Sequence, residues 1–578
     1  MERGYPRPQL ERTWWLNLNG SWDFEFDDLN EGMTNKWYEN HQYTKKIHVP
    51  FPYQSKLSGI NDLSMHDRIW YHRTFNLHLP QDKRFILHFG AVDYETTVYI
   101  NKQLVGTHVG GSSSFSFDIT DYLVNGLAQE ISVAVFDPSM DPYISRGKQT
   151  WKERPFECYY DRTSGIWQTV WLEYLDEAAI ENIKIVPDLD QKSVTFEIDT
   201  YNHADKTIEL EISFDGKLIN KHQQMMNQKT SFSIDIENPF FWSPETPNLY
   251  DIKLKVYADG DLVDEAKSYF GFRKISIQGN QILLNNKPYY LRLVLDQGYY
   301  QDGLLSYPDE KTLEQDIIDA KKMGFNGCRK HEKIEAERWM YYADKLGYLV
   351  SLEMPSQYEF REDERFVNEW VLAMKRDFNY PSLFMYVPFN ESWGVKDIKN
   401  SIDQQEYVKK VYYLTKALDS SRIVISNDGW EQPVTEVCTI HTYRHGKVDD
   451  LARQAEFHQS LTNFDMLLSS IHTDGNKPIY VNDEKYHGEP IILSEFGGIS
   501  YANQQQIGWG YTGVDTKEDL ENELRRIFSV VYESKHFAGF CYTQLSDVEQ
   551  EINGFLTYDR KPKLPFEVLR SIVTNDEK

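Results

Sequence analysis

The first part of the chain alternates hydrophobic and polar residues with the period of two that is typical of half-buried β-strands. Such runs occupy residues 85–89, 97–100 and 131–135. Turn-forming pairs such as Gly110-Gly111 and Asn125-Gly126 separate neighbouring runs. Short strands with frequent turns and no helical period predict a β jelly-roll sandwich, to which we assign residues 1–175.

A second all-β unit is expected over residues 176–275. Three more alternating runs occupy residues 194–198, 210–214 and 252–256. Asp215-Gly216 and Asp259-Gly260 are typical of β-hairpin turns. A unit of about a hundred residues with this pattern predicts an immunoglobulin-like β-sandwich, here without a pair of cysteines.

From residue 276 onward the pattern changes to strands and helices in alternation. Apolar runs predict strands that begin near residues 289, 326, 348, 383, 423, 439, 491 and 540. Between the first two runs, Leu313 and Ile317 keep helical spacing and Gly324 supplies a stop, and Gly347 does the same for the next helix. Strand–helix units repeated over about 300 residues predict a C-terminal (β/α)8 TIM barrel, residues 276–578.

Composition narrows the range of functions. The net charge of −27, without a basic patch, argues against binding to nucleic acid or to an anionic membrane. The four cysteines lie far apart, so neither a disulfide framework nor a zinc site is indicated. No apolar signal core or membrane-spanning run occurs, so we expect a cytoplasmic protein. Aromatic residues make up 14% of the chain, and such rings bind sugars by stacking.

Two of the predicted barrel strands end in a glutamate. Glu391 follows the apolar run 383–389, and Glu495 ends the run that precedes Gly497-Gly498. In a (β/α)8 barrel the active site lies at the C-terminal ends of the strands, and two carboxylates facing one cleft can cleave a glycosidic bond. We interpret Glu391 as the acid/base and Glu495 as the nucleophile. The alternative is a structural ion-pair role at the barrel mouth, which is less able to explain two such positions.

The sequence around both glutamates resembles that of a known enzyme family. Val-Pro-Phe-Asn-Glu-Ser-Trp-Gly at residues 387–394 and Leu-Ser-Glu-Phe-Gly-Gly at 493–498 resemble the acid/base and nucleophile motifs of glycoside hydrolase family 2. That family includes β-galactosidases, β-glucuronidases and β-mannosidases. Further similar segments occupy residues 162–170, 326–331 and 553–562. The order of the three predicted domains is also the family's, so the resemblance covers nearly the whole chain.

The resemblance implies further roles at the predicted cleft. The family retains anomeric configuration through a covalent glycosyl-enzyme. Asn390 would bond the sugar 2-hydroxyl, and Arg329 would keep Glu495 ionised. His331 would contact sugar hydroxyls, although it follows Arg329 by two residues where the family often has three, and Tyr443 would hydrogen-bond the nucleophile.

Each of these residues also has a structural alternative. Asn390 could form a turn and Arg329 a salt bridge at the barrel mouth. His331 could be a structural histidine whose hydrogen bonds are made within the protein, and Tyr443 could pack in the core.

Four more residues lie at or near the ends of predicted strands. His441 and Trp430 are cleft candidates, with core packing as an equal alternative. Asp296 follows the first barrel strand, where sugar hydroxyls could bind. Tyr542 on the last strand occupies the place of a stacking tryptophan in many members of the family. The tyrosine in place of this tryptophan leaves the size and identity of the sugar subsite open.

The sequence favours a neutral sugar. In β-glucuronidases of the family, an Asn-x-Lys element before the glycine of the C-terminal motif recognises the sugar carboxylate. Here Glu551-Ile-Asn553 precedes Gly554, so that lysine is absent and a negative charge is added. We therefore expect a retaining exo-β-glycosidase of β-galactosidase type that acts on a carbohydrate substrate.

Other functions remain open at this point. They are a β-glucuronidase, another β-glycosidase or transglycosylase of the family, and a non-catalytic carbohydrate-binding protein. We expect no cofactor and no metal ion, because the mechanism needs no organic cofactor and no metal-ligand cluster stands out. A homo-oligomer is expected from the resemblance alone.

Overall fold

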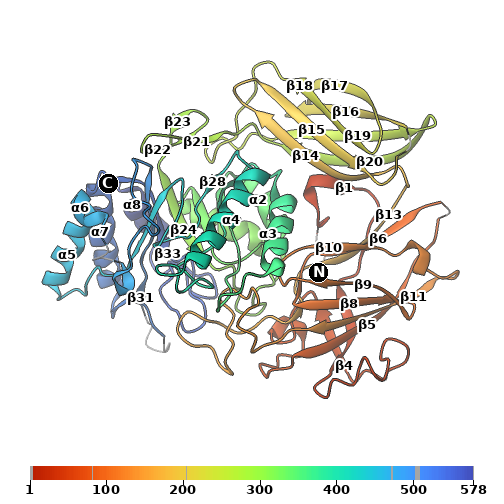
Figure 1. Cartoon of the computed structure of the whole chain (residues 1–578), viewed down its shortest axis with the longest axis horizontal. Helices are drawn as coiled ribbons and strands as arrows, with labels where there is room; N and C mark the ends of the chain where they lie inside the picture. The colour runs from red at the N-terminus through yellow and green to blue at the C-terminus, as the bar shows by residue number, and fades with distance from the viewer. Residues whose placement is uncertain (1–3, 81, 204, 470–472, 502–507, 577–578) are drawn as a thin grey trace.

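The computed structural model describes residues 4–80, 82–203, 205–469, 473–501 and 508–576. Figure 1 shows three bodies in chain order: a red-to-orange β-domain, a yellow β-domain above it, and a green-to-blue α/β domain beside both. The predicted architecture of jelly roll, immunoglobulin-like sandwich and TIM barrel is confirmed.

The N-terminal domain is a sandwich of two antiparallel sheets. Its strands are β2 (Leu16–Asn17), β3 (Gly20–Phe26), β4 (Lys45–Val49), β5 (Arg68–Asn76), β6 (Arg84–Phe89), β7 (Val92–Asp93), β8 (Glu95–Ile100), β9 (Gln103–Val109), β10 (Phe115–Asp118), β11 (Ala128–Phe136), β12 (Gly165–Ile166) and β13 (Val170–Leu175). One sheet has the order β10-β6-β13-β2 and the other β4-β3-β5-β11-β8-β9. Alternate residues such as Tyr71, Leu87 and Val133 point inward and form the core between the sheets.

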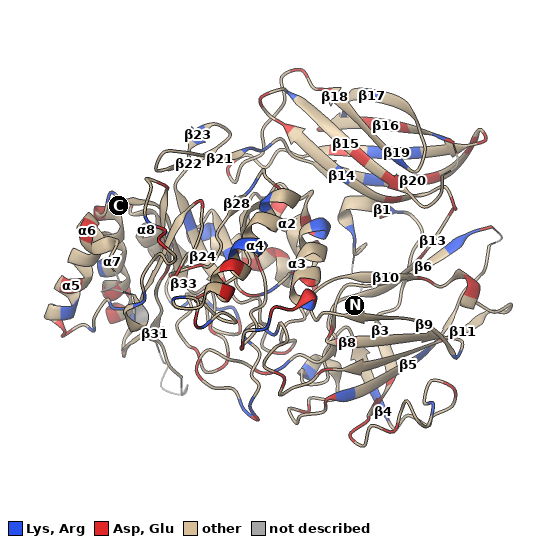
Figure 2. Ribbon diagram, viewed as in Figure 1, with Lys and Arg blue, Asp and Glu red and all other residues tan. Residues whose placement is uncertain are grey.

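The second domain is a smaller sandwich. Its strands are β1 (Glu11–Arg12), β14 (Ile180–Asp188), β15 (Ser193–Thr200), β16 (Lys206–Phe214), β17 (Lys217–Met226), β18 (Lys229–Asp235), β19 (Tyr250–Ala258) and β20 (Asp261–Phe270). The two sheets have the orders β1-β20-β19-β16-β17 and β14-β15-β18. On the larger sheet, basic positions of β19 lie between acidic positions of β16 and β20 (Figure 2), as in the pairs Lys253–Glu265 at 3.4 Å and Lys255–Glu209 at 3.6 Å.

The third domain is built on one sheet of eight parallel strands. They are β24 (Leu291–Asp296), β25 (Gly327–Lys330), β26 (Leu349–Glu353), β27 (Leu383–Val387), β28 (Ile423–Val424), β29 (Cys438–Thr442), β30 (Ile491–Gly497) and β33 (Phe537–Thr543). Their order is β28-β27-β26-β25-β24-β33-β30-β29, so the first and last strands of the barrel are paired. Each apolar run of the sequence forms one of these strands. Short strands β21 (Ile275–Gln278), β22 (Gln281–Leu284) and β23 (Lys287–Pro288) precede them.

Helices follow the barrel strands, except that none lies between β28 and β29. They are α1 (Glu310–Lys322), α2 (Glu337–Leu346), α3 (Glu364–Asp377), α4 (Ile402–Leu418), α5 (Leu451–Thr462), α6 (Phe464–Leu467), α7 (Lys517–Glu533) and α8 (Phe566–Thr574), with strands β31 (Ile499–Tyr501) and β32 (Thr512–Val514) before α7. Apolar faces that include Leu313, Trp339 and Trp370 pack into the main core. Among the described residues, no helix combines the length and the apolar character that a membrane crossing requires.

A loop of the jelly roll reaches the barrel at the C-terminal ends of its strands. The amides of Arg146 and Gly147 both donate to the carbonyl of Ser356 at 3.1 Å, and the amide of Tyr358 donates to Pro142 at 3.0 Å. Ser356 and Tyr358 follow β26, so this contact places jelly-roll residues beside the edge at which a barrel forms its active site.

Candidate active site

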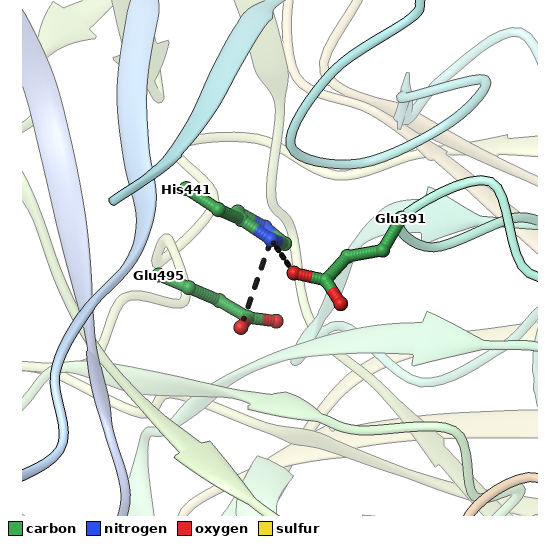
Figure 3. Close-up of side chains that lie close together, drawn as sticks. All are labelled: Glu391, His441 and Glu495. Atoms are coloured by element: carbon green, nitrogen blue, oxygen red, sulfur yellow. Dashed lines mark hydrogen bonds and ion pairs between the residues drawn. The ribbon is translucent and has the colours of Figure 1, made fainter. Parts of the chain in front are cut away.

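Three side chains from neighbouring strand ends converge at the barrel mouth. Glu391 follows β27, His441 lies on β29 and Glu495 on β30 (Figure 3). His441 Nδ1 lies 2.8 Å from Glu391 Oε1 and 3.6 Å from Glu495 Oε2. An oxygen of each glutamate lies within 4.8 Å of an oxygen of the other. The side chain of Glu391 is 19% exposed and that of Glu495 is 6% exposed, so the pair lies in a recess that solvent still reaches.

The backbone around Glu391 is held in an unusual conformation. Glu391 and Ser392 have φ angles of 51° and 62°, which are uncommon for residues other than glycine. The Glu391 amide donates to the carbonyl of Asp428 at 3.0 Å, and the Ser392 amide donates to Asn427 Oδ1 at 3.0 Å. These hydrogen bonds to the segment after β28 fix the turn, and with it the direction of the Glu391 side chain.

A buried arginine anchors the second carboxylate. The Arg329 guanidinium on β25 donates to Glu495 Oε1 at 2.9 Å and to Glu353 Oε1 at 2.8 Å, and it lies 2.8 Å from Asp428 Oδ2. Burial lowers the pKa of Arg329, but Asp428, Glu353 and Glu495 raise it well above its usual value. Arg329 is therefore a permanent cation that fixes Glu495 in place.

Tyr443 contacts Glu495 from the other side. Its hydroxyl lies 2.5 Å from Glu495 Oε2 and 2.9 Å from Thr543 Oγ1. The Tyr443 ring stacks on Tyr511, with 3.4 Å between ring centroids. A Cβ at Gly498, where φ is 66°, would lie 2.5 Å from Tyr511 Cδ2, so the glycine after the glutamate makes room for this stack.

The charges at the site place a proton on His441. Burial raises the pKa of Glu391, but the hydrogen bond and charge of His441, with the charge of Lys148, lower it to about 2. Burial lowers the pKa of His441, but the charges of Glu495 and Asp428 and its hydrogen bonds to Asp428 and Glu391 raise it to about 10. Near neutral pH, Glu391 and His441 thus form an ion pair that shares one proton.

Two other sequence-predicted residues lie next to this cluster. Asn390 Oδ1 accepts from Arg329 at 3.2 Å, and its Nδ2 donates to Glu332 Oε1 at 3.4 Å. His331 Nδ1 lies 3.0 Å from Glu353 Oε2. Both side chains are buried, and these hydrogen bonds hold them within the cluster.

The remaining candidates are placed differently. The Trp430 ring meets His441 edge to face, with 5.5 Å between centroids. Asp296 is paired with Lys330 Nζ at 2.8 Å, and no contact links it to either glutamate among the described residues. Tyr542 is buried against Phe555, with 4.4 Å between centroids, and its hydroxyl accepts from the Ile499 amide at 3.4 Å. The structure therefore does not bring Asp296 or Tyr542 into contact with the carboxylate pair.

Sequence reasoning missed one cation near the site. Lys148 belongs to the jelly-roll loop and is only 8% exposed. Its Nζ lies 3.8 Å from Cys158 Sγ, and no carboxylate of the described residues lies within 4.0 Å of it. Burial lowers the pKa of Lys148, but Cys158, Glu332 and Glu391 are among the groups that raise it well above its usual value. No pattern along the chain pointed to Lys148, because it reaches the barrel only in the folded protein.

The carboxylate of Glu551 lies where the jelly-roll loop meets the last barrel loops. Glu551 Oε2 accepts from the Tyr160 hydroxyl at 2.5 Å, and Oε1 accepts from Asn553 at 3.0 Å. Trp509 Nε1 donates to the carbonyl of Glu157 at 2.8 Å in the same region. The jelly-roll loop and the last barrel loops are thereby joined. In the sequence, Glu551 stood out only because its segment, Glu551-Ile-Asn553, lacks the lysine of the Asn-x-Lys element.

The converging trio is also the one group of described residues whose ligand atoms could hold a metal ion. Its two carboxylates are the candidate catalytic groups, so an ion there would occupy the space between them. The sequence did not indicate this group, because its members are 50 or more residues apart.

Comparison with known proteins covers nearly all of the chain. Models described as glycosyl hydrolases family 2 match residues 16–175 (sugar binding domain), 178–273 and 275–575 (TIM barrel domain). The chain is similar to a β-galactosidase of Thermoanaerobacter pseudethanolicus, 26% identical over 70% of this chain and 53% of the relative, so it spans about half of that protein. It is 23% identical to a β-glucuronidase of Paenibacillus borealis over 98% of both chains.

The fold is similar to that of a solved β-glucuronidase from Ruminococcus gnavus in complex with an N1-substituted uronic isofagomine. The TM-score is 0.78 and the identity 19%, over 98% of this chain and 99% of the other. At this identity the likeness concerns the fold alone.

Proposed function

The chain belongs to glycosyl hydrolases family 2, and from this membership we propose that it is a retaining, exo-acting β-glycosidase. The observation that carries the proposal is the spacing of Glu391 and Glu495, whose nearest oxygens lie within 4.8 Å. Retaining enzymes hold their carboxyl groups about 5–5.5 Å apart, whereas inverting enzymes need about 6.5–9.5 Å to admit a water molecule.

In the first step Glu495 attacks the anomeric carbon. The bond from that carbon to the leaving oxygen breaks, and the oxygen takes a proton from Glu391. Since Glu391 is ionised in the free site, its proton comes from His441 along their 2.8 Å hydrogen bond. The products are a glycosyl ester on Glu495, a neutral His441 and the released alcohol.

In the second step a water molecule replaces the leaving group. Glu391 accepts a proton from the water and passes it to His441, while the water oxygen attacks the anomeric carbon. The ester bond to Glu495 breaks, and Arg329 and Tyr443, at 2.9 and 2.5 Å, stabilise the carboxylate that leaves. Two displacements at the same carbon return the original configuration.

The charges around the recess favour a neutral terminal sugar, with a β-galactoside as the first candidate. Glu332 and Glu551 are buried beside the site, and carboxylates accept hydrogen bonds from hydroxyl groups. They would repel a sugar that bears a carboxylate of its own.

A β-glucuronide is the second candidate, because one observation favours it. The buried Lys148 ammonium has no carboxylate within 4.0 Å among the described residues, so it could pair with a sugar carboxylate. Relatives named β-glucuronidase match the chain as well as those named β-galactosidase do.

Hydrolysis of 4-nitrophenyl β-glycosides tests both candidate substrates. The panel holds the galactoside, glucoside, mannoside, glucuronide, fucoside and arabinoside, each with the wild type, Glu495→Gln and Glu391→Gln. We expect one neutral glycoside to be preferred and kcat/KM to fall on the order of a thousandfold or more in Glu495→Gln. Glu369→Gln, a buried carboxylate outside the site, serves as the control and should keep its activity.

The first sugar anomer released, followed by NMR, tests the mechanism. A β-anomer is expected, and an α-anomer would contradict the double displacement. Turnover of the glucuronide alone would replace the first candidate by the second. Full activity of Glu495→Gln would refute the assignment of the nucleophile.

A further inference from the structure

Half-buried aromatic rings gather beside Glu391. Trp151 comes from the jelly-roll loop, Tyr358 from the segment after β26, and Trp393 lies two residues beyond Glu391. Ring centroids are 3.9 Å apart for Trp151 and Tyr358, and 5.7 Å apart for Tyr358 and Trp393, which are stacked. Each of the three rings keeps part of its surface exposed.

A fourth ring lies beneath them. Tyr159 is 5% exposed and meets Trp393 and Trp151 edge to face, with centroids 5.8 and 4.6 Å away. Burial raises the pKa of Tyr159, and the charge of Glu391 is among those that raise it further, so the carboxylate lies within electrostatic range of this ring. Trp151, Tyr159, Tyr358 and Trp393 therefore form a closed circle of contacts, here called the Trp393 platform.

The platform is held in position before any ligand arrives. The amides of Tyr358 and Glu359 donate to the carbonyl of Pro142 at 3.0 and 2.9 Å, and Gln357 Nε2 donates to Tyr143 at 2.7 Å. A Cβ at Gly394 would lie 3.3 Å from Gln357, so the loop after Glu391 packs closely on the same segment. Rings fixed in this way lose little conformational entropy on binding.

We propose that the Trp393 platform binds the leaving group of the glycoside, and that this leaving group is a second pyranose. The inference rests on the proposed function, because Glu391 protonates the leaving oxygen and the leaving group must then lie on the Glu391 side. A pyranose offers a flat C–H face to an aromatic ring, and its hydroxyls need polar partners at the rim.

Such partners are present. Lys396 Nζ lies 3.0 Å from Glu359 Oε1 and 5.5 Å from the centroid of the Trp393 ring. An aryl leaving group would use the ring but not this charged rim. The favoured substrate is therefore an oligosaccharide with a terminal β-linked sugar, not an aryl glycoside.

The test compares three substrates that share the sugar identified by the panel: the methyl glycoside, the 4-nitrophenyl glycoside and a disaccharide with glucose as leaving group. In Trp393→Ala, kcat/KM for the disaccharide should fall on the order of tenfold relative to that for the methyl glycoside. Trp393→Phe, which keeps a ring, should recover much of the loss. Tyr413→Ala, on the exposed face of α4, is the control and should leave the ratio unchanged.

Each outcome decides a different point. An equal loss with all three substrates would mean that Trp393 only positions Glu391 and would overturn the proposal. If Trp393→Ala lowered kcat/KM for the nitrophenyl glycoside but not for the disaccharide, the platform would bind an aryl leaving group and not a pyranose. If the wild type hydrolyses none of the three, the proposed function fails first, independently of the platform.

Discussion

At the scale of single residues, the site depends on a histidine that links both carboxylates. His441 is fully buried and lies 2.8 Å from Glu391, 3.6 Å from Glu495 and 3.2 Å from Asp428. A general acid must hold a proton at the working pH, yet beside the charge and hydrogen bond of His441 the pKa of Glu391 is lowered to about 2. Near neutral pH the proton of the pair resides on His441, and in the proposed mechanism the pair, and not Glu391 by itself, supplies it.

The pH dependence of kcat/KM tests this sharing. In the wild type the pair keeps its proton until the pH approaches the pKa of His441, about 10, so the alkaline limb lies high. In His441→Asn the proton must reside on Glu391, whose pKa burial raises once the charge and hydrogen bond of His441 are gone. We expect the alkaline limb to follow the titration of Glu391 and to move to lower pH.

The leaving group supplies the control for this prediction. A 2,4-dinitrophenyl glycoside needs little protonation, so its hydrolysis by His441→Asn should keep the wild-type profile more closely than that of a methyl glycoside. Identical alkaline limbs in wild type and variant would show that His441 does not supply the proton.

The sequence predicted Glu391 and Glu495 as neighbours because the ends of parallel barrel strands meet at one edge, and the family resemblance added Arg329 and Tyr443. Asp428 escaped notice, since it follows the two-residue strand β28 and no periodic pattern marks its position. The ion pair of Glu391 with His441 could not be predicted either. It depends on the left-handed turn at Glu391 and on hydrogen bonds to the segment around Asp428, which only the folded chain brings together.

At the scale of secondary-structure elements, glycines end helices where the sequence predicted. Gly347 follows α2 with a φ of 73°, and its amide donates to the carbonyl of Ala343. A Cβ at Gly347 would lie 2.6 Å from the carbonyl oxygen of Pro244, in the segment between β18 and β19 of the second domain. The pattern predicted the stop, whereas the contact with Pro244 spans a hundred residues and left no local signal.

We expect Gly347→Ala to lower the free energy of unfolding by about 2–4 kcal/mol, through backbone strain and the contact with Pro244. Gly260→Ala is the matched control, because φ is 90° there but nothing lies within 4 Å of the added Cβ. It should cost about 1–2 kcal/mol from strain alone. Chemical denaturation of both variants measures the difference, and equal losses would exclude the steric contribution of Pro244.

At the scale of the whole molecule, the order and fold of the three domains followed from periodicity and family resemblance, but the contacts between them did not. Lys148, Tyr159 and Tyr160 reach the barrel from a loop without regular structure, more than two hundred residues before Glu391. The alternating and helical patterns of apolar residues indicate which side chains are buried within one domain. They contain no information on which loop of one domain covers the mouth of another.

One such interdomain contact makes stability depend on pH. Glu369 on α3 is 1% exposed, and its Oε1 accepts from the Ser112 amide of the jelly roll at 2.6 Å. Burial raises the pKa of Glu369 from 4.5 to about 7, more than its hydrogen bonds lower it. Between these two values the folded protein holds a proton that the unfolded chain has lost. The stability of the wild type therefore falls as the pH rises from about 4.5 to about 7.

Glu369→Gln removes this titration and keeps an acceptor for Ser112. Relative to the wild type, the variant should gain up to about 3 kcal/mol between pH 4.5 and 8, since each pKa unit corresponds to about 1.4 kcal/mol. Thermal unfolding midpoints across that range measure the gain, with Glu456→Gln as a control because this residue lies partly exposed on α5. A difference that stays constant with pH would mean that Glu369 does not titrate in this window, and that the jelly roll and barrel are joined there by an ionised carboxylate.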